Sequence, residues 1–255
     1  MTAAPRTVLV HPDATVLAEA TAARLLTRLV DVQSAAAPVH VVLTGGTVGI
    51  RTLAAVAASP ARDAVDWSGV HLWWGDERFL ADGDPDRNET QARDALISAL
   101  GDALPGANVH PMRALDEAAG IATPEDSAAA YAAELAAFAP EGSDVPAFDV
   151  LMLGMGPDGH VASLFPGHEA VGTTGATVGV HGSPKPPPLR VSLTFEAIHA
   201  AQEVWVVAAG AEKAGAVASA LADAPVEQTP AAGARGTRAT LWLVDAAAVA
   251  EVGAA

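Results

Sequence analysis

Short apolar runs alternate with longer alanine-rich stretches along most of this chain. The apolar runs have the length of strands, and their nearly continuous apolar character is typical of strands buried on both faces. The alanine-rich stretches have the spacing of helices, and 190–202 is expected to be a strand followed by a short helical turn. Strands are predicted at 7–10, 40–43, 70–74, 148–153, 203–208 and 239–244, and helices at 14–30, 48–58, 88–100, 125–138 and 211–222.

The alternation of strand and helix predicts parallel pairing with right-handed crossovers. We therefore expect a Rossmann-like, doubly wound α/β fold, with a mostly parallel sheet and helices on both faces. The length of 255 residues fits one large domain or two small ones. No linker or internal repeat divides the chain, so a single domain over 1–255 is predicted. The long glycine- and proline-rich stretch 166–190 is expected to be either a lid or a disordered loop.

Composition narrows the classes of function. The net charge of −16 disfavours a nucleic-acid partner, because phosphate backbones need clustered Lys and Arg, yet a few cations in a crevice could still bind a small phosphorylated substrate. The absence of cysteine excludes a disulfide framework, a thiolate metal site and a cysteine nucleophile. No apolar run reaches the roughly 18–20 residues of a membrane span, and no signal-peptide core is found near the N-terminus. We expect a cytoplasmic protein.

A glycine pair flanked by threonines, Thr44-Gly45-Gly46-Thr47, follows the strand predicted at 40–43 and precedes a helix. Glycines at such a turn let backbone N–H groups approach an anion, and the helix N-terminus adds a favourable dipole. The two threonine hydroxyls could donate hydrogen bonds to phosphate oxygens. A tight turn capped by threonine would explain the same residues, so the motif alone leaves both interpretations open.

Three ionisable residues, Asp76, Glu77 and Arg78, follow the strand predicted at 70–74. They must be solvated or used in a site, because a buried charge without a partner is very costly. Arginine suits a phosphate site, since its planar fork meets phosphate through two hydrogen bonds. A strand that ends in water with a local ion pair is the alternative.

His160 follows the strand predicted at 148–153 and lies among glycines. The carboxyl end of a strand is the usual place for a ligand crevice in an open α/β sheet. A histidine there can move a proton near neutral pH, because its unperturbed pKa is about 6.5. Asp158, two residues earlier, could orient or tune the imidazole.

The glycine spacing at 154–159 literally matches the dinucleotide fingerprint. That fingerprint opens a helix in the first βα unit, and an acidic residue ends a second strand about 20 residues later. Here the glycines come late in the chain, and glycine-rich loop occupies the place of the second strand. We predict no nicotinamide or flavin cofactor.

Two basic residues lie further along the chain. Arg190 follows a proline run, and Lys213 follows the strand predicted at 203–208 and opens a helix. Each could be a surface cation or could reach an anion in the same crevice. No HExxH or Cys/His spacing suggests a metal site, no G-x-S-x-G elbow suggests a serine hydrolase, and the other histidines are interpreted as structural or exposed.

The stretch LGMGPDGHVASLFPG at 153–167 resembles the signature of the 6-phosphogluconolactonases, which hydrolyse a sugar-phosphate lactone. The threonine–glycine turn, the Asp76-Glu77-Arg78 run followed by Asn88, and the patterns around Arg190 and Lys213 resemble the same family in the same order. The resemblance covers nearly the whole chain.

The resemblance implies hydrolysis of 6-phospho-D-glucono-1,5-lactone to 6-phospho-D-gluconate by a monomer or small homo-oligomer, without metal or cofactor. It implies that His160 is the general base and that Asp158 orients or tunes it. Arg78 would face the phosphate or the hydroxyls, with the two acidic residues before it orienting Arg78 or binding the sugar. The residues implied for substrate or phosphate binding are Thr44, Gly45, Gly46, Thr47, Asp76, Glu77, Arg78, Asn88, Arg190 and Lys213.

Two alternatives remain open. The glucosamine-6-phosphate deaminases resemble this chain as well, but their signature resembles DGHIAFNEP, whereas this chain has DGHVASLFPG, which favours the lactonase. A non-catalytic sugar-phosphate sensor is the other alternative. The presence of both Asp158 and His160 argues against it.

Overall fold

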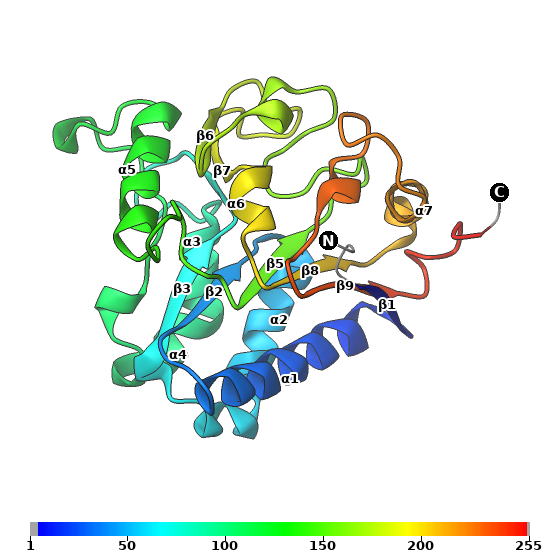
Figure 1. Cartoon of the computed structure of the whole chain (residues 1–255), viewed down its shortest axis with the longest axis horizontal. Coiled ribbons are helices and arrows are strands. Elements are labelled where there is room, and N and C mark those ends of the chain that lie inside the picture. The colour runs from blue at the N-terminus through cyan, green and yellow to red at the C-terminus, as the bar shows by residue number, and fades with distance from the viewer. Residues whose placement is uncertain (1–4, 254–255) are drawn as a thin grey trace.

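The computed structural model describes residues 5–253, and its centre is a six-stranded parallel sheet (Figure 1). The strand order is β1-β9-β8-β5-β2-β3, so the first and last strands of the chain pair along one edge. The alternating pattern of the sequence therefore gives the predicted doubly wound arrangement. The six strands are β1 (Arg6–His11), β2 (Val39–Leu43), β3 (Val70–Trp74), β5 (Val150–Gly154), β8 (Glu203–Ala208) and β9 (Ala239–Asp245).

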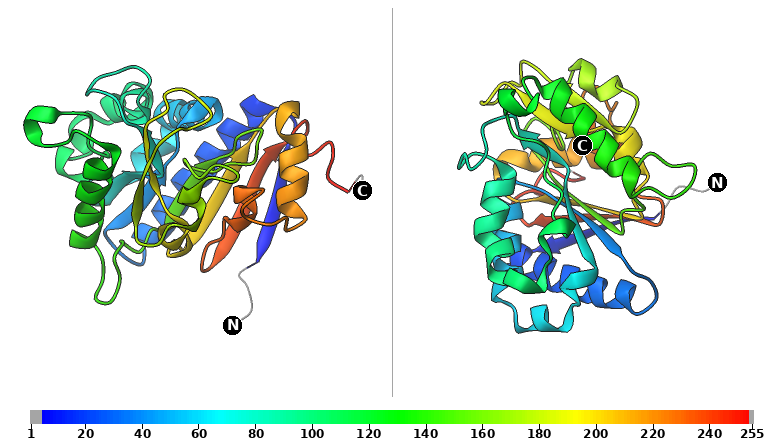
Figure 2. Two further views of the ribbon diagram at one scale, coloured as in Figure 1. Left: turned by 90° about the horizontal axis from the view of Figure 1, so that it is seen from above. Right: turned by 90° about the vertical axis from the view of Figure 1, so that its left-hand side faces the viewer.

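Helices cover both faces of this sheet, as predicted (Figure 2). Successive strand residues point to opposite faces: Val41 packs in a buried cluster with α1 and α2, and Val42 packs in a second cluster with α5, α6 and α7. The larger helices are α1 (Ala14–Gln33), α2 (Gly46–Ala58), α5 (Pro124–Ala137) and α7 (Ala214–Leu221), and the shorter ones are α3 (Asn88–Ala92), α4 (Ser98–Leu100) and α6 (Phe195–His199). No helix within residues 5–253 is both long enough and apolar enough to cross a bilayer.

Local sequence explains where two of the long helices begin. The side chain of Asp13 accepts hydrogen bonds from the backbone N–H groups of residues 15 and 16, which caps α1. α5 starts at a capping box in which Thr123 and Asp126 each accept from the other's backbone, with Pro124 in the first turn. The helix predicted at 88–100 is divided into α3, a π-helical turn at 93–97 and α4.

A second, three-stranded antiparallel sheet was not predicted. Its order is β4-β7-β6, with β4 at Asp76–Arg78, β7 at Arg190–Leu193 and β6 at Thr177–Val180. The stretch 166–190 is therefore not irregular throughout, because it contains β6 and a 3₁₀ turn at 169–172. α5 packs on β6, where the Thr177 hydroxyl donates to the Ala128 carbonyl at 2.7 Å.

The direction of the chain across the large sheet reverses between β2 and β5. From β2 the chain moves outward to β3, whereas from β5 it moves the other way to β8 and β9. The carboxyl ends of β2 and β5 thus diverge into loops that leave a crevice, which is where open α/β sheets bind their ligands. Thr44 follows β2 and Gly154 ends β5, so both predicted glycine motifs meet at this point.

Candidate active site

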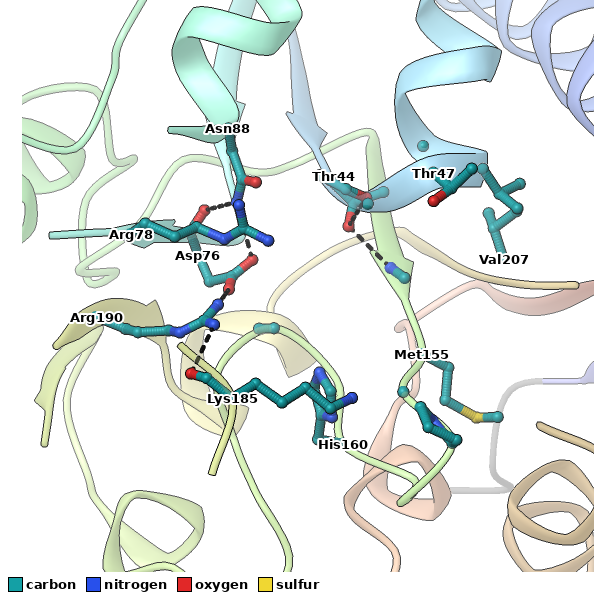
Figure 3. Close-up of a pocket in the computed structure, with 18 of the residues that line it drawn as sticks. Thr44, Thr47, Asp76, Arg78, Asn88, Met155, His160, Lys185, Arg190 and Val207 are labelled. Carbon is teal, nitrogen blue, oxygen red and sulfur yellow. Dashed lines mark hydrogen bonds and ion pairs between the residues drawn. The ribbon is translucent and has the colours of Figure 1, made fainter. Parts of the chain in front are cut away.

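A cleft of about 280 Å³ opens at the carboxyl ends of β2 and β5 (Figure 3). Its volume is near the lower end of the range of about 300–1,000 Å³ that is usual for small-molecule sites. Ten of the residues predicted for the site line it, namely Thr44, Gly45, Gly46, Thr47, Asp76, Arg78, Asn88, His160, Arg190 and Lys213. Glu77 and Asp158 do not line it, and act from behind the residues that do.

His160 is held at the cleft by a tight turn after β5. Within that turn, Gly156 donates its backbone N–H to the carbonyl of His160 at 3.0 Å, and Gly159 takes a positive φ of +83°. The Nδ1 atom of His160 lies 2.5 Å from Oδ1 of Asp158, and its ring packs on Phe165 with a centroid distance of 4.6 Å. The imidazole is therefore fixed in orientation on two sides.

The contact with Asp158 also fixes the tautomer of His160. Burial opposes ionisation of this carboxyl, but the hydrogen bond and charge of His160 and the charge of Lys185 lower the pKa of Asp158 to about 2. The carboxylate then accepts the Nδ1 proton and leaves the lone pair of Nε2 for chemistry. A neutral imidazole held in this way can take a proton from a water molecule in the cleft.

The threonine–glycine turn forms the opposite wall of the cleft. Gly45 is the N-cap of α2 and offers no side-chain cap, so the first backbone N–H groups of this helix remain available to an anion. The Thr44 hydroxyl accepts from the backbone N–H of Gly154 at 2.9 Å, which ties the ends of β2 and β5 together. Thr47, in the first turn of α2, is exposed to the cleft.

Asp76 connects the loop that carries His160 to the segment that carries Asn88. One of its carboxylate oxygens accepts from the hydroxyl of Ser163 at 2.7 Å, and its backbone carbonyl accepts from the side-chain amide of Asn88 at 2.8 Å. Asn88 in turn lies against Gly45, where an added Cβ would be 1.9 Å from the amide oxygen. Arg78 donates to the backbone carbonyl of Asp86 at 2.5 Å.

Glu77 is almost fully buried and supports the site through the backbone. Its carboxylate accepts hydrogen bonds of 2.6–2.8 Å from the N–H groups of Arg78, Asn88 and Glu89, and it lies 3.7 Å from the buried Arg87. Burial raises the pKa of Glu77 to about 7, while Arg87 and the three N–H groups oppose that rise. Glu77 thus fixes Arg78 and the start of α3, and does not face a sugar in the cleft.

Arg190 and Lys213 differ in whether their charged groups are already bonded to the protein. Arg190 is buried, and its guanidinium donates to the backbone carbonyls of 185, 186 and 187. Lys213 ends a 3₁₀ turn at 211–213, and burial lowers the pKa of its ammonium below the usual range. Arg190 therefore supports the backbone of the preceding segment, whereas Lys213 offers its charge to the cleft.

Two polar side chains of the site were not predicted from the sequence. Lys185 reaches the cleft from the proline run, and its Nζ lies 3.7 Å from Oδ1 of Asp158. Ser163 lies behind the cleft on Asp76. The signal for Ser163 was its place in the signature at 153–167, but Lys185 had none, because it lies in a stretch without regular pattern.

Three histidines cluster at the other end of β2 and β3, at their amino ends. His110 lies 2.9 Å from His71 and 2.7 Å from Glu134, and its ring stacks on Trp73 at 4.0 Å. Trp73 donates its indole N–H to His40 at 3.1 Å. These contacts agree with the structural interpretation of the histidines. Within residues 5–253, no group of three or more His, Cys, Asp or Glu side chains is arranged to hold a metal ion.

Comparison with known proteins decides the family. The model of the family described as glucosamine-6-phosphate isomerases/6-phosphogluconolactonase matches residues 12–242, which is most of the chain. The chain belongs to this family. A relative from Streptomyces coelicolor, named 6-phosphogluconolactonase, is 57% identical over 248 residues that cover 96% of this chain and 94% of that one.

Solved structures of the family share the fold of this chain. The 6-phosphogluconolactonase from Trypanosoma brucei superposes with a TM-score of 0.80 and 28% identity, over 96% of this chain and 98% of that one. A monomeric glucosamine-6-phosphate deaminase superposes with a TM-score of 0.77 over 95% and 98% of the two chains. Its identity is only 15%, so this second likeness concerns the fold alone.

Proposed function

We propose that this chain hydrolyses 6-phospho-D-glucono-1,5-lactone to 6-phospho-D-gluconate, a step of the oxidative pentose phosphate pathway. The observation that carries the proposal is His160, which lines the cleft and is held by Asp158 behind it, while the other walls bear cations and an uncapped helix N-terminus. The relative from Streptomyces coelicolor carries the corresponding name at 57% identity. A proton acceptor facing an anion site suits a phosphorylated ester.

In the proposed mechanism, Nε2 of His160 removes a proton from a water molecule as its oxygen attacks the lactone carbonyl carbon. Asp158 stabilises the imidazolium that forms, because its carboxylate accepts the Nδ1 proton. The tetrahedral intermediate then collapses with cleavage of the bond between this carbon and the ring oxygen. His160 returns its proton to the departing oxygen, which gives the hydroxy acid and regenerates the neutral base.

The substrate phosphate and hydroxyls are assigned to the other walls. Arg78 and Lys213 bring positive charge to the cleft, and the start of α2 adds backbone N–H groups. Asp76 and Asn88 present polar atoms that suit sugar hydroxyls. Glu77 and Arg190 are assigned supporting roles, in keeping with their backbone contacts.

We also propose a cytoplasmic location, no nucleic-acid partner, and action as a monomer or small homo-oligomer. The net charge of −16 supports the second point, because a nucleic acid would be repelled by most of the surface. The absence of cysteine fits a reducing compartment.

The test measures acid release from freshly prepared 6-phosphogluconolactone, together with ammonia release from glucosamine 6-phosphate. We expect acid release that rises in proportion to protein concentration above the spontaneous rate, and no ammonia. His160→Ala removes the general base and should lower turnover by about 10²–10⁴-fold. Its circular dichroism spectrum should match that of the wild-type protein, which shows that the fold is intact. Ammonia release would move the assignment to the deaminases, and near-normal turnover of His160→Ala would contradict the role of His160.

A further inference from the structure

Lys185 shares a single carboxylate oxygen with His160. The Nζ atom of Lys185 lies 3.7 Å from Oδ1 of Asp158, and the same oxygen lies 2.5 Å from Nδ1 of His160. Figure 3 shows the Lys185 side chain extended across the cleft towards the imidazole. A positive charge in this place competes with the imidazolium for the negative charge of Asp158.

Arg190 fixes the backbone from which Lys185 extends. Its guanidinium donates to the carbonyls of Lys185 and Pro186 at 3.1 Å and of Pro187 at 3.2 Å. Arg190 is itself held in β7, next to β4, and its Nη1 lies 3.9 Å from a carboxylate oxygen of Asp76. A buried, multiply bonded arginine therefore sets where the flexible lysine side chain begins.

Other charged groups also face His160 across the cleft. Asp76 and Arg78 come from β4, Arg190 from β7, and Lys213 from the turn after β8. Asp76 accepts a hydrogen bond from Ser163 and forms an ion pair with Arg190. Arg190 also donates hydrogen bonds to backbone carbonyls. In the part of the chain that the structure describes, Lys185 is the one Lys or Arg that forms an ion pair with Asp158.

We propose that Lys185, positioned by Arg190, keeps His160 in its neutral, proton-accepting form at the pH at which the enzyme works. Lys185 would do so by weakening the support that Asp158 gives to the imidazolium. Lys185 is thus a positioning residue that acts through Asp158. The inference rests on the function proposed above, and in particular on His160 as the base.

The experiment compares the pH dependence of kcat/KM for lactone hydrolysis in the wild-type enzyme and in Lys185→Met. The side chain of Lys185 is 41% exposed, so the methionine variant is expected to fold normally. The charge of Lys185 lies 3.7 Å from the partly solvated carboxylate of Asp158. Removal of a unit charge at that distance should displace the acidic side of the pH profile by about 0.5–1 pH unit. We expect the acid limb of the profile, where kcat/KM falls as His160 becomes protonated, to move to higher pH by that amount in Lys185→Met. At a fixed pH on this limb, kcat/KM should be about three- to tenfold lower than in the wild-type enzyme.

Three further variants separate position from charge. Lys185→Arg keeps the charge and should restore the wild-type limb. Arg190→Gln releases the lysine backbone and should move the limb in the same direction as Lys185→Met. Arg24→Met removes one exposed positive charge from α1, outside the lining of the cleft, and should leave the limb in place.

The outcomes distinguish the two proposals. If the wild-type enzyme does not hydrolyse the lactone, the proposed function fails and the inference fails with it. If the wild-type enzyme is active and the limb of Lys185→Met stays in place, only the inference is overturned. A raised KM with an unmoved limb would likewise overturn it, because Lys185 would then be binding substrate.

Discussion

Gly156 has no side chain, and the space that one would fill is occupied by the His160–Asp158 pair. A Cβ built on Gly156 would lie 2.2 Å from both Cε1 and Nδ1 of His160 and 2.4 Å from Oδ1 of Asp158. Ordinary van der Waals contact begins at 3.4 Å, so the imidazole in Gly156→Ala must move by about 1.2 Å. The methyl group cannot be accommodated while the histidine keeps its place.

A shift of this size should reduce turnover far more than stability. A misplacement of about 1 Å in a reacting group can lower the rate about 10²-fold. We therefore expect kcat for lactone hydrolysis to fall about 100-fold in Gly156→Ala, because Nε2 no longer points at the attacking water. KM should change little, since the threonine–glycine turn and the cations of the other walls are untouched.

The assay is initial-rate acid release from the lactone, with thermal unfolding measured in parallel. Gly106→Ala is the matched control, because an added Cβ at Gly106 meets no atom within 4 Å. We expect the control to keep wild-type turnover. If Gly156→Ala keeps more than about a third of wild-type kcat while the control behaves normally, the reasoning about His160 placement is refuted.

Three further predictions concern buried polar groups. Glu77→Gln replaces one acceptor oxygen by an NH₂ donor that faces a backbone N–H. The free energy of unfolding measured in urea should therefore fall by about 2–4 kcal/mol. An unchanged unfolding midpoint would contradict the role of Glu77 in fixing α3. Ser163→Ala removes the 2.7 Å hydrogen bond to Asp76 and should cost about 1–3 kcal/mol by the same measurement, whereas a neutral result would mean that the carboxylate finds another donor. Burial and two neighbouring histidines lower the pKa of His40 to about 4, so the unfolded chain, with its pKa near 6.5, binds this proton more tightly than the folded protein does. Stability should therefore be lost as the pH falls from 6.5 towards 4, by up to about 3 kcal/mol, and the unfolding free energy of His40→Asn should lack this part of the pH dependence; equal slopes for the two proteins would count against it.

The large sheet could be predicted from the sequence because most positions of its strands are apolar, although Arg6, Thr7 and His11 of β1 are polar. Such runs are recognisable without knowledge of their neighbours, and the intervening helices determine parallel pairing. The small sheet could not be predicted in this way. β4 has only three residues, all charged, and β6 contains Gly179, so neither shows a strand period. Their strand character depends on pairing with β7, which is remote from β4 in the chain.

The sequence also predicted that the site residues lie close together, because this follows from the predicted parallel sheet. Thr44 and His160 follow strands whose carboxyl ends must lie at one edge of a parallel sheet. The direction in which a carboxylate points was not predictable. Glu77 looks like a cleft residue in the sequence, yet its partners are backbone N–H groups. Lys185 was missed because its place depends on three carbonyl contacts with Arg190.

β1 lies at the edge of the large sheet, where its neighbour is β9, the last strand of the chain. During synthesis the N-terminal strand therefore has no ladder to join until residues 239–245 have left the ribosome. Folding of this domain cannot proceed simply from the first residue to the last, and closing the edge requires contacts that span nearly the whole chain. Amide hydrogens of β1 should accordingly gain protection from exchange late during refolding, after those of β2, β3 and β5.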